Sequence, residues 1–565
     1  MGHATTRTLD RMAAAIGTLN GAPIEFERVD DVPEGGVLLA LPALLENGLL
    51  RHSRAMFSMK EGFYPLETIF LLLALMALAR IGSLEGLRYF VPGEWGKLLG
   101  LDRIPEVKTL RDKISSLCHQ QELPQRWSST LAKEWMEADP QSAGVFYIDG
   151  HVRVYHGELT DLPRRYIARQ RLCLRGTTDY WVNAMDGQPF FVVTQAVDPG
   201  LLTVLQEKII PRLLEDAPLQ PTTEEIANDK LLHRFVVVFD REGYSPEAFA
   251  GLKEKRIAII SYHKYPKEQW PIQEFSIREV QLIHGEKVQM QLAERGCCLS
   301  NGLWVREIRK RSDSGHQTSI LSTDYRSDLT QIAPAMFARW CQENFFKYMC
   351  QHYNLDRLAE YQTQALPDST RVVHPAWRHL DSQVRKQLAL LNREQARFGA
   401  FCLQAQPTPQ QLEDFLHQKG EMQQQISQRQ CQIDELKKKR KELSKHIEIK
   451  DLPEKDRFER LREDKKHFLD TIKLIAYRAE TAMVHVLREK MQRLDDARAL
   501  VRQVFSSTVD LIPDHQNKSL TVRLHHMTAA VHDEPVKYLC EELNATETLF
   551  PGTDLRLIFK LSGSS

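Results

Sequence analysis

The chain has few cysteines, no long apolar run and no excess of charge of either sign. Its nine cysteines include no Cys-x-x-Cys pair, which argues against a zinc site, and their sparse, odd number is typical of a reducing compartment. The longest apolar run, Ile69 to Ala79, is closed by Arg80. It is too short to cross a bilayer, so we expect a buried helix there and no membrane partner. The N-terminus shows no secretion signal, which favours a cytoplasmic protein.

Charge balance limits what the composition says about partners. Lys+Arg and Asp+Glu are equal at 75 each. Any affinity for a nucleic acid must therefore come from local basic patches. With 565 residues the chain is too long for one hydrophobic core, and two to four domains are expected.

Three acidic residues stand where a strand ends or a helix presents a face. Asp149 closes Val-Phe-Tyr-Ile-Asp, Asp240 closes Phe-Val-Val-Val-Phe-Asp, and Glu343 lies in a helical segment about one hundred residues further on. Each alone is more often a turn or cap residue. Together they can converge on one point, which would suit two divalent cations and a phosphodiester.

Residues 1–138 are expected to form a helical, helix-turn-helix-like DNA-binding domain. A short helix ends at Gly100, and a second helix follows Pro105 with one apolar face. Lys108, Arg111 and Lys113 lie outside that face and are candidates for DNA binding. An ordinary helical hairpin with a charged, solvated surface is an equal alternative.

Residues 139–365 are expected to form an α/β catalytic domain with the element order three strands, helix, strand, helix, strand. Val152 to Tyr155 is expected to be a strand that pairs with the Asp149 strand after a turn at Gly150, and Asp186-Gly187 predicts a hairpin turn. Strand-like segments without a long helix predict a β-rich insertion at about 262–330, followed by a helix at about 332–352.

Residues 366–565 are expected to form a mainly helical C-terminal region. Apolar residues at alternating steps of four and three predict a short coiled coil at about 420–449, with Arg429 and Arg440 in two of its core positions. An intramolecular hairpin and a dimer are equally compatible with that pattern. A long helix at about 455–505 and a small α/β tail follow.

Residues 140–350 resemble a DDE transposase of the insertion-sequence type that carries a β insertion before the glutamate. Asp240-Arg241-Glu242 resembles the motif at the second acid of that family, and Arg339-x-x-x-Glu343 resembles part of its Tyr-Arg-Glu-Lys motif. The tyrosine and lysine of that motif fall at Met336 and Cys350. Lys347 and Tyr348 are the nearest substitutes.

The resemblance implies an RNase H-like core in which Asp149, Asp240 and Glu343 are catalytic ligands of two Mg²⁺ ions, with Mn²⁺ able to replace them. It implies phosphate contacts from Arg241, Arg339, Lys347 and Tyr348. It also implies a base-stacking tryptophan in the β insertion, for which Trp304 and Trp270 are the candidates. Arg309 and Lys310 belong to a local basic cluster of the insertion and are candidates for DNA contact, with an exposed charge cluster balanced by nearby acids as an equal alternative.

The function that follows is a cut-and-paste transposase. It would bind the inverted-repeat ends of its element, cleave the DNA and transfer the 3′-hydroxyl to target DNA. We expect it to work as a homodimer on double-stranded DNA, associated with the nucleoid of a bacterial cytoplasm. The alternatives are an RNase H-like nuclease or resolvase without strand transfer, and a non-catalytic DNA-binding protein derived from a transposase.

Overall fold

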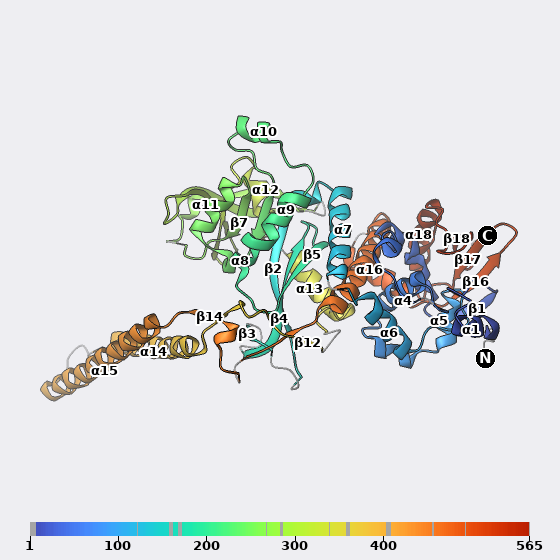
Figure 1. The fold of residues 1–565 in the computed structure, drawn as a ribbon. Helices are drawn as coiled ribbons and strands as arrows, with labels where there is room; N and C mark the ends of the chain where they lie inside the picture. The colour runs from blue at the N-terminus through green and yellow to red at the C-terminus, as the bar shows by residue number, and fades with distance from the viewer. Residues whose placement is uncertain are drawn as a thin grey trace. The chain divides into compact units, whose positions relative to one another are not determined.

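A computed structural model describes residues 7–60, 62–120, 122–157, 162–167, 172–266, 268–282, 286–337, 340–357, 362–402, 408–454, 457–491 and 493–563. The chain divides into two compact units. Unit 1 comprises Met1–Tyr155, Arg165–Gln362 and Arg462–Ser565, and unit 2 comprises His156–Arg164 and Thr363–Leu461. Figure 1 shows the elements of both units.

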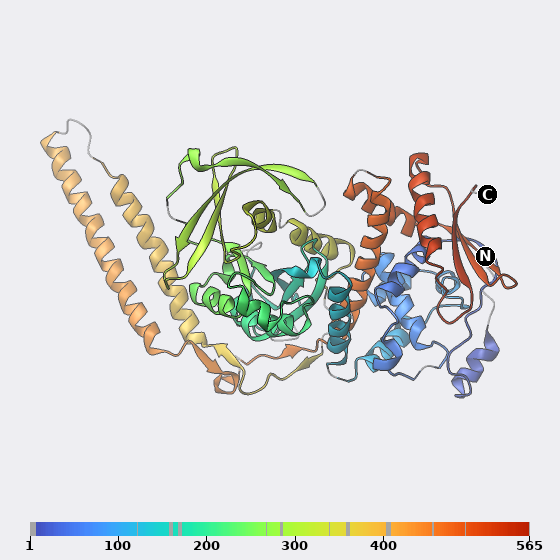
Figure 2. The ribbon, with the colours of Figure 1, turned by 90° about the horizontal axis from the view of Figure 1, so that it is seen from above.

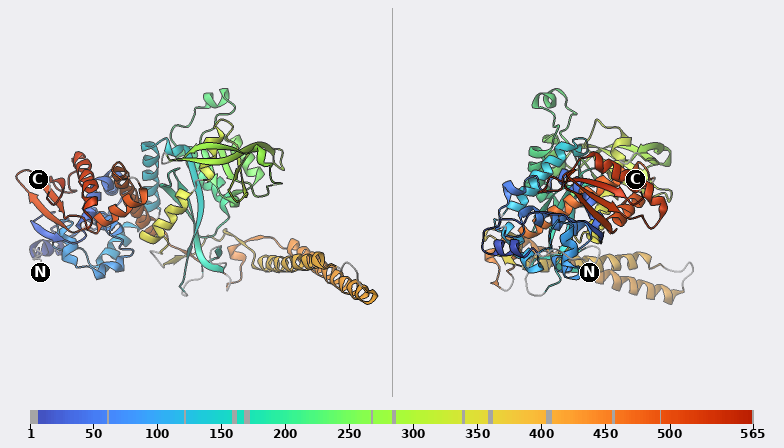
Figure 3. Two further views of the ribbon diagram at one scale, coloured as in Figure 1. Left: turned by 180° about the vertical axis from the view of Figure 1, so that it is seen from behind. Right: turned by 90° about the vertical axis from the view of Figure 1, so that its right-hand side faces the viewer.

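This division differs from the one expected from the sequence. The tail after residue 462 does not form a region with the helices before it, but belongs to the same unit as the N-terminal residues. The physical reason is a shared sheet and a shared core. Strand β1 (Val29–Val32) pairs with β16 (Val509–Asp514) in a sheet of order β1-β16-β17-β18, and helix α16 (Asp464–Arg488) packs against α4 (Leu66–Leu78). Figure 3 shows the C-terminal strands of this sheet in red.

Helices of the N-terminal part of unit 1 are short except for α4 and α7. They are α1 (Thr8–Ala15), η1 (Gly35–Ala40), α2 (Leu41–Glu46), α3 (Ser53–Met56), η2 (Leu84–Tyr89), α5 (Pro92–Lys97), α6 (Val107–Leu117), α7 (Leu123–Ala138) and η3 (Ser142–Gly144). Residues Ile69 to Ala79, expected to form a buried helix, lie in α4 and its C-cap, and all are buried except Ala79. Helix α6 buries the apolar face that the sequence predicts.

A large mixed sheet forms the centre of unit 1. Its strand order is β3-β4-β2-β6-β7-β11-β10-β9-β8, and β5 pairs with β4 outside this path. Strands β2, β6 and β7 are parallel to one another, whereas β4 runs antiparallel to both of its partners, β2 and β5. The strands are β2 (Val145–Val154), β3 (Arg164–Ile167), β4 (Leu172–Asn183), β5 (Pro189–Gln195), β6 (Val236–Phe239), β7 (Ala258–Tyr262), β8 (Ser276–Gln281), β9 (Lys287–Cys298), β10 (Trp304–Arg311) and β11 (Gln317–Ser322).

The order of elements around β2, β4, β5, β6 and β7 is the one expected from the sequence. The β4–β5 hairpin turns at Asp186-Gly187, where Gly187 has a positive φ of 90°. A helical segment, α8 (Leu201–Val204), η4 (Leu205–Ile209) and α9 (Ile210–Asp216), then leads past α10 (Thr223–Asn228) to β6. After β6, the short helix η5 (Arg241–Gly243) precedes α11 (Pro246–Glu254), which begins after the N-cap Ser245, as predicted.

One strand expectation is wrong. Residues after Gly150 do not turn back on the Asp149 strand, because β2 continues unbroken to Val154 and pairs with β4. Gly150 lies directly opposite Tyr180, and a Cβ at this glycine would lie 3.1 Å from the Tyr180 ring. The glycine thus serves a close approach of two strands and not a turn.

The β insertion continues the same sheet beyond β7. Strand β11 pairs with β7, and β10, β9 and β8 follow as antiparallel neighbours, with η6 (Ile272–Glu274) before β8. The helix expected at 332–352 is described as α12 (Leu329–Phe337) and α13 (Trp340–His352). The C-terminal elements of the unit are α16, α17 (Leu494–Phe505), β16, β17 (Ser519–Leu524), η9 (Ala530–His532), α18 (Asp533–Ala545) and β18 (Arg556–Leu561).

Unit 2 is built on an antiparallel pair of helices, α14 (Pro375–Ala400) and α15 (Pro409–Glu442), which lie side by side in Figure 2. Arg429 and Arg440, expected in core positions, form ion pairs with Glu394 and Asp381 of α14. Of the two arrangements compatible with the sequence, the chain thus contains the intramolecular hairpin. Its remaining elements are β12 (Thr363–Gln364), β13 (Arg371–Val373), β14 (His446–Glu448), η7 (Ile449–Asp451) and β15 (Arg460–Leu461).

The coiled-coil helix is shorter than expected at its C-terminal end. It stops at Glu442, and the following residues extend so that His446–Glu448 pairs with Arg371–Val373. Likewise, the long helix expected at 455–505 is two helices, α16 and α17.

Candidate active site

Asp149 and Asp240 lie at neighbouring positions of two adjacent parallel strands. The register pairs Ile148 of β2 with Phe239 of β6. Asp149 directly follows Ile148, and Asp240 directly follows Phe239. Neighbouring strands are about 4.8 Å apart, so the two carboxylates leave the sheet side by side. Both residues are half-buried. The sequence predicts this convergence from the apolar run that precedes each acid, although β2 continues past Asp149 to Val154.

Helix α13 covers the face of the sheet to which Asp149 belongs. Side chains two apart on a strand share a face, so Asp149 shares its face with His151, whose ring stacks on Phe346 of α13 at 5.4 Å. Trp181, directly opposite Asp149 on β4, contacts Phe345 and Phe346. Helix α13 therefore packs over β2 and β4 beside Asp149.

Helix α12 covers the same face next to α13. Tyr147 of β2 and Val238 of β6, each two residues before one of the aspartates, form a buried cluster with Ile332, Ala335 and Met336 of α12. The opposite face carries Phe146, Ile148, Val237 and Phe239, which belong to the main core of unit 1. The two aspartates thus belong to the face beneath α12 and α13.

Glu343 belongs to α13, one helical turn before Phe346. Its side chain lies outside the described residues, as does Arg339 altogether. The backbone nevertheless places the glutamate position on the helix that contacts His151 and Trp181. All three acids therefore come from elements that meet on one face of the sheet.

Negative charge is concentrated beside Asp240. The carboxylate of Asp240 accepts a hydrogen bond from the backbone N–H of Arg241 at 2.5 Å, and that of Asp149 accepts one from Gly150 at 2.9 Å. Burial and the negative charges of Asp198 and Asp240 raise the pKa of Glu242 above its ordinary value. Asp198 lies in the loop before α8, outside any strand end or motif that the sequence marks.

A buried carboxylate anchors the C-terminal half of α13. Glu480 of α16 is 0 % exposed and accepts hydrogen bonds from the hydroxyls of Tyr348 and Tyr353 and, at 2.8 Å, from Nη2 of Arg80. Nη1 of Arg498 on α17 lies 3.6 Å from the same carboxylate. Three regions far apart in the sequence thus fix the helix that carries Glu343.

Electrostatics keeps Glu480 ionised despite its burial. Burial by itself would raise the pKa of this carboxyl, but the positive charges of Arg80 and Arg498 hold it below its ordinary value. Burial and the Glu480 charge raise the pKa of Tyr348. The hydroxyl of Tyr348, a sequence candidate for phosphate contact, is therefore a donor within this cluster, whereas Lys347 beside it is exposed.

In the β insertion the candidate residues have different surroundings. Arg309 is buried and donates to Glu307 at 2.8 Å, while Lys310 is half-buried. Burial opposes ionisation of Glu307, but hydrogen bonds from His263, Ser319 and Arg309 lower its pKa to about 2. The insertion thus has a buried charged interior.

The two candidate tryptophans of the insertion also differ. Trp304 is 52 % exposed and lies beside Tyr325, with its ring over Gly296. Trp270 is buried, and the guanidinium groups of Arg295 and Arg309 both lie against its ring. Of the two rings, that of Trp304 is the one accessible for stacking.

Basic residues of α6 lie away from its buried face, as the sequence predicts. Lys108 and Arg111 are exposed, and Lys113 is half-buried. Arg111 forms an ion pair with Glu85, and Nζ of Lys113 donates to the carbonyl of Lys60 at 3.0 Å. Arg241, next to Asp240, is exposed.

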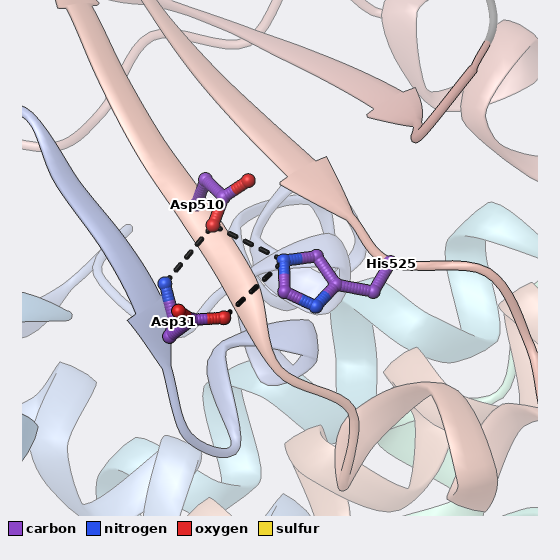
Figure 4. Close-up of side chains that lie close together, drawn as sticks. All are labelled: Asp31, Asp510 and His525. Atoms are coloured by element: carbon purple, nitrogen blue, oxygen red, sulfur yellow. Dashed lines mark hydrogen bonds and ion pairs between the residues drawn. The ribbon is translucent and has the colours of Figure 1, made fainter.

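Among the described residues, one group of three side chains comes close enough to share a metal ion. It belongs to the sheet of β1 and β16, whereas Asp149 belongs to the large mixed sheet. Asp31 of the β1 strand, Asp510 of β16 and His525 form this group (Figure 4). Nε2 of His525 lies 3.1 Å from Oδ1 of Asp510, which also accepts from the backbone N–H of Asp31 at 2.9 Å. Arg523 donates to the other oxygen of Asp510. Hydrogen bonds and ion pairs account for this arrangement.

Within the described part of the chain, no helix is both long and apolar enough to cross a membrane. Residues 2–563 match the model of a protein family described as "Transposase protein". A search of curated proteins finds no match.

Proposed function

The chain belongs to this transposase family, and we propose that it is a DDE-type enzyme whose catalytic core is RNase H-like. The observation that carries the proposal is the register of β2 and β6, which brings Asp149 and Asp240 to adjacent positions on one face. The strand order β5-β4-β2-β6-β7, in which only β4 runs antiparallel to the other four strands, supports an RNase H-like arrangement.

Asp149, Asp240 and Glu343 would hold two Mg²⁺ ions. Carboxylate oxygens are the ligands that Mg²⁺ prefers, and the strand spacing of about 4.8 Å suits the separation of about 4 Å in two-metal sites. Burial and the negative charges of Asp198 and Asp240 raise the pKa of Glu242, and divalent cations would offset that negative charge. When bound, such ions activate the attacking oxygen and stabilise the leaving oxygen of a phosphodiester.

The residues around this site would bind and orient DNA. Arg241, Arg339 and Lys347 would contact backbone phosphates near the acids, while Tyr348 would help to position α13 through its bond to Glu480. Trp304 and Lys310 of the insertion and the basic residues of α6 would extend the contact surface. Such phosphate contacts would make binding strongly dependent on salt. Because both ends of the mobile DNA element must be cut, we propose that the enzyme acts as a dimer on DNA.

The test uses the full chain, Mg²⁺ and a plasmid with the DNA that flanks its reading frame. We expect cleavage and joining by the wild type, and loss of both in Asp149→Asn, Asp240→Asn and Glu343→Gln with DNA binding retained. Asp313→Asn, an exposed aspartate of the β10–β11 turn, is the matched control and should stay active. Cleavage that survives Asp240→Asn would rule out the assignment.

The same assay separates the alternatives. Nicked plasmid without joined product would identify a nuclease or resolvase. Binding without any cleavage by the wild type, with Mg²⁺ or Mn²⁺, would identify a non-catalytic DNA-binding protein.

A further inference from the structure

A second site lies at the other end of α13 from Glu343. A cavity of about 270 Å³ opens between α4, the segment that follows α4, the end of α13 and α16. One side is apolar, formed by Leu73, Met76 and Ala77 of α4 together with Leu469 and Ile472 of α16. An apolar wall of this kind accepts the body of a small organic molecule.

The polar lining of the cavity is mainly cationic. Arg80, Arg111, Arg357 and Lys473 line it, against the single carboxylate of Glu85, which pairs with Arg111. His352 also lines it, and burial and nearby arginines lower the pKa of this histidine. The lining therefore carries an excess of positive charge.

Arg80 contributes a cationic side chain to the lining of this cavity. The side chain is 22 % exposed, and its Nη2 donates to Glu480 and Tyr348. An anion in the cavity would be attracted by the charge of this guanidinium group.

Lys473 of α16 supplies a second cation to the lining. Its Nζ donates to the carbonyl of Asn354 at 3.0 Å and lies 3.9 Å from Asp470, and its side chain is 16 % exposed. Burial and the charge of Lys466 lower the pKa of Lys473 to about 8. A bound anion would favour the charged form of this lysine.

We propose that this cavity binds a small organic anion, with a phosphate or carboxylate group at Arg80 and Lys473 and an apolar or aromatic body along α4 and α16. Both a free phosphate monoester and a terminal nucleotide of DNA have this chemistry. None of the three acids of the proposed active site takes part in this binding.

Calorimetric titration of the full chain with phenyl phosphate tests the proposal. We expect phenyl phosphate to bind at least about tenfold more tightly than inorganic phosphate or benzyl alcohol, because only the ester meets both walls. Lys473→Met keeps the apolar stem and removes the charge, and it should weaken binding by about tenfold or more. Ala77→Phe should block the cavity without changing its charge.

Controls separate this site from the proposed active site. Lys490→Met, at an exposed lysine after α16, and Asp240→Asn should both bind like the wild type. If Asp240→Asn abolishes binding, the ligand lies at the acids and the proposal fails. Binding that is equal for ester and inorganic phosphate, or unchanged in both Lys473→Met and Ala77→Phe, would also overturn it.

Two further measurements use the same protein. The affinity for phenyl phosphate should fall as the pH rises from 7 to 9, because Lys473 then loses its proton. The charged groups that act on this lysine are Lys466, Asp470, Asp356 and Arg357. A 5′-phosphorylated oligonucleotide should displace phenyl phosphate if the natural source is a DNA end. If it does not, the source is a free phosphate ester. An affinity that does not change with pH would exclude Lys473 as a ligand group.

Discussion

Glu480→Gln should destabilise unit 1 strongly. The amide keeps the shape of the side chain but removes the negative charge that faces Arg80 and Arg498 in a site where Glu480 is 0 % exposed. Removing one partner of a buried ion pair costs about 3–5 kcal/mol, because the other charge stays buried without compensation. The amide N–H groups would in addition face donors, namely Tyr348 and Tyr353.

Partial removal of the cluster should have smaller effects. Tyr353→Phe deletes one hydrogen bond, to Glu480, whereas Tyr348→Phe deletes the bond to Glu480 and the one that Tyr348 accepts from Arg80. One hydrogen bond to a charged group is worth about 1.5–3 kcal/mol. The matched control is Glu279→Gln, where an exposed carboxylate pairs with Lys287 on the neighbouring strand of the insertion. A surface ion pair contributes at most about 1 kcal/mol, so the control should be nearly as stable as the wild type.

Urea unfolding followed by tryptophan fluorescence measures these differences, since Trp181 packs against α13. The expected order of stability is wild type and Glu279→Gln, then the two phenylalanine variants, then Glu480→Gln. A loss below about 1 kcal/mol in Glu480→Gln would refute the view that a buried ionised carboxylate holds α13, because exposed pairs already reach that value.

Three further predictions concern the insertion and unit 2. The pKa of Glu307 is lowered to about 2 from 4.5, so its contribution to stability is present above pH 4.5 and is lost as the pH falls toward 2. Melting curves across that window should show a smaller decline for Glu307→Gln, and equal declines would contradict the assignment. Gly296→Val should displace the ring of Trp304, since a Cβ there would lie 2.7 Å from it, and an unchanged Trp304 emission would be the opposing result. Arg440→Ala removes the ion pair with Asp381 and should increase hydrogen exchange at the facing turns of α14 and α15 by about fivefold, equivalent to about 1 kcal/mol; unaltered exchange would show that the pair does not hold the hairpin closed.

Several elements follow from local sequence because their causes are local. The apolar run before Asp240 forms β6, Asp186-Gly187 forms a hairpin turn with Gly187 at positive φ, and Ser245 caps α11. Each depends on burial or backbone preference within a few residues. The adjacency of Asp149 and Asp240 needs more than local sequence, since it depends on the register of β2 with β6, and β2 continues past Asp149 to Val154.

Other features depend on partners that are distant in the sequence. Strand β1, with two aspartates among its four residues, carries no strand signal and forms only because β16 lies beside it. The sequence does not indicate that β2 continues past Gly150, because a glycine after an aspartate also suits a turn, and only Tyr180 on β4 shows that this glycine serves close approach.

The sequence by itself determined the elements that carry the acids, because hydrophobic periodicity and turn residues act over a few positions. The tertiary structure alone decided that Glu480 receives Arg80, Tyr348 and Tyr353, and that Arg80 and Lys473 line one cavity. The two partners in each of these contacts are separated by more than one hundred residues along the chain. A buried charge therefore finds its partners only through the packing of whole helices.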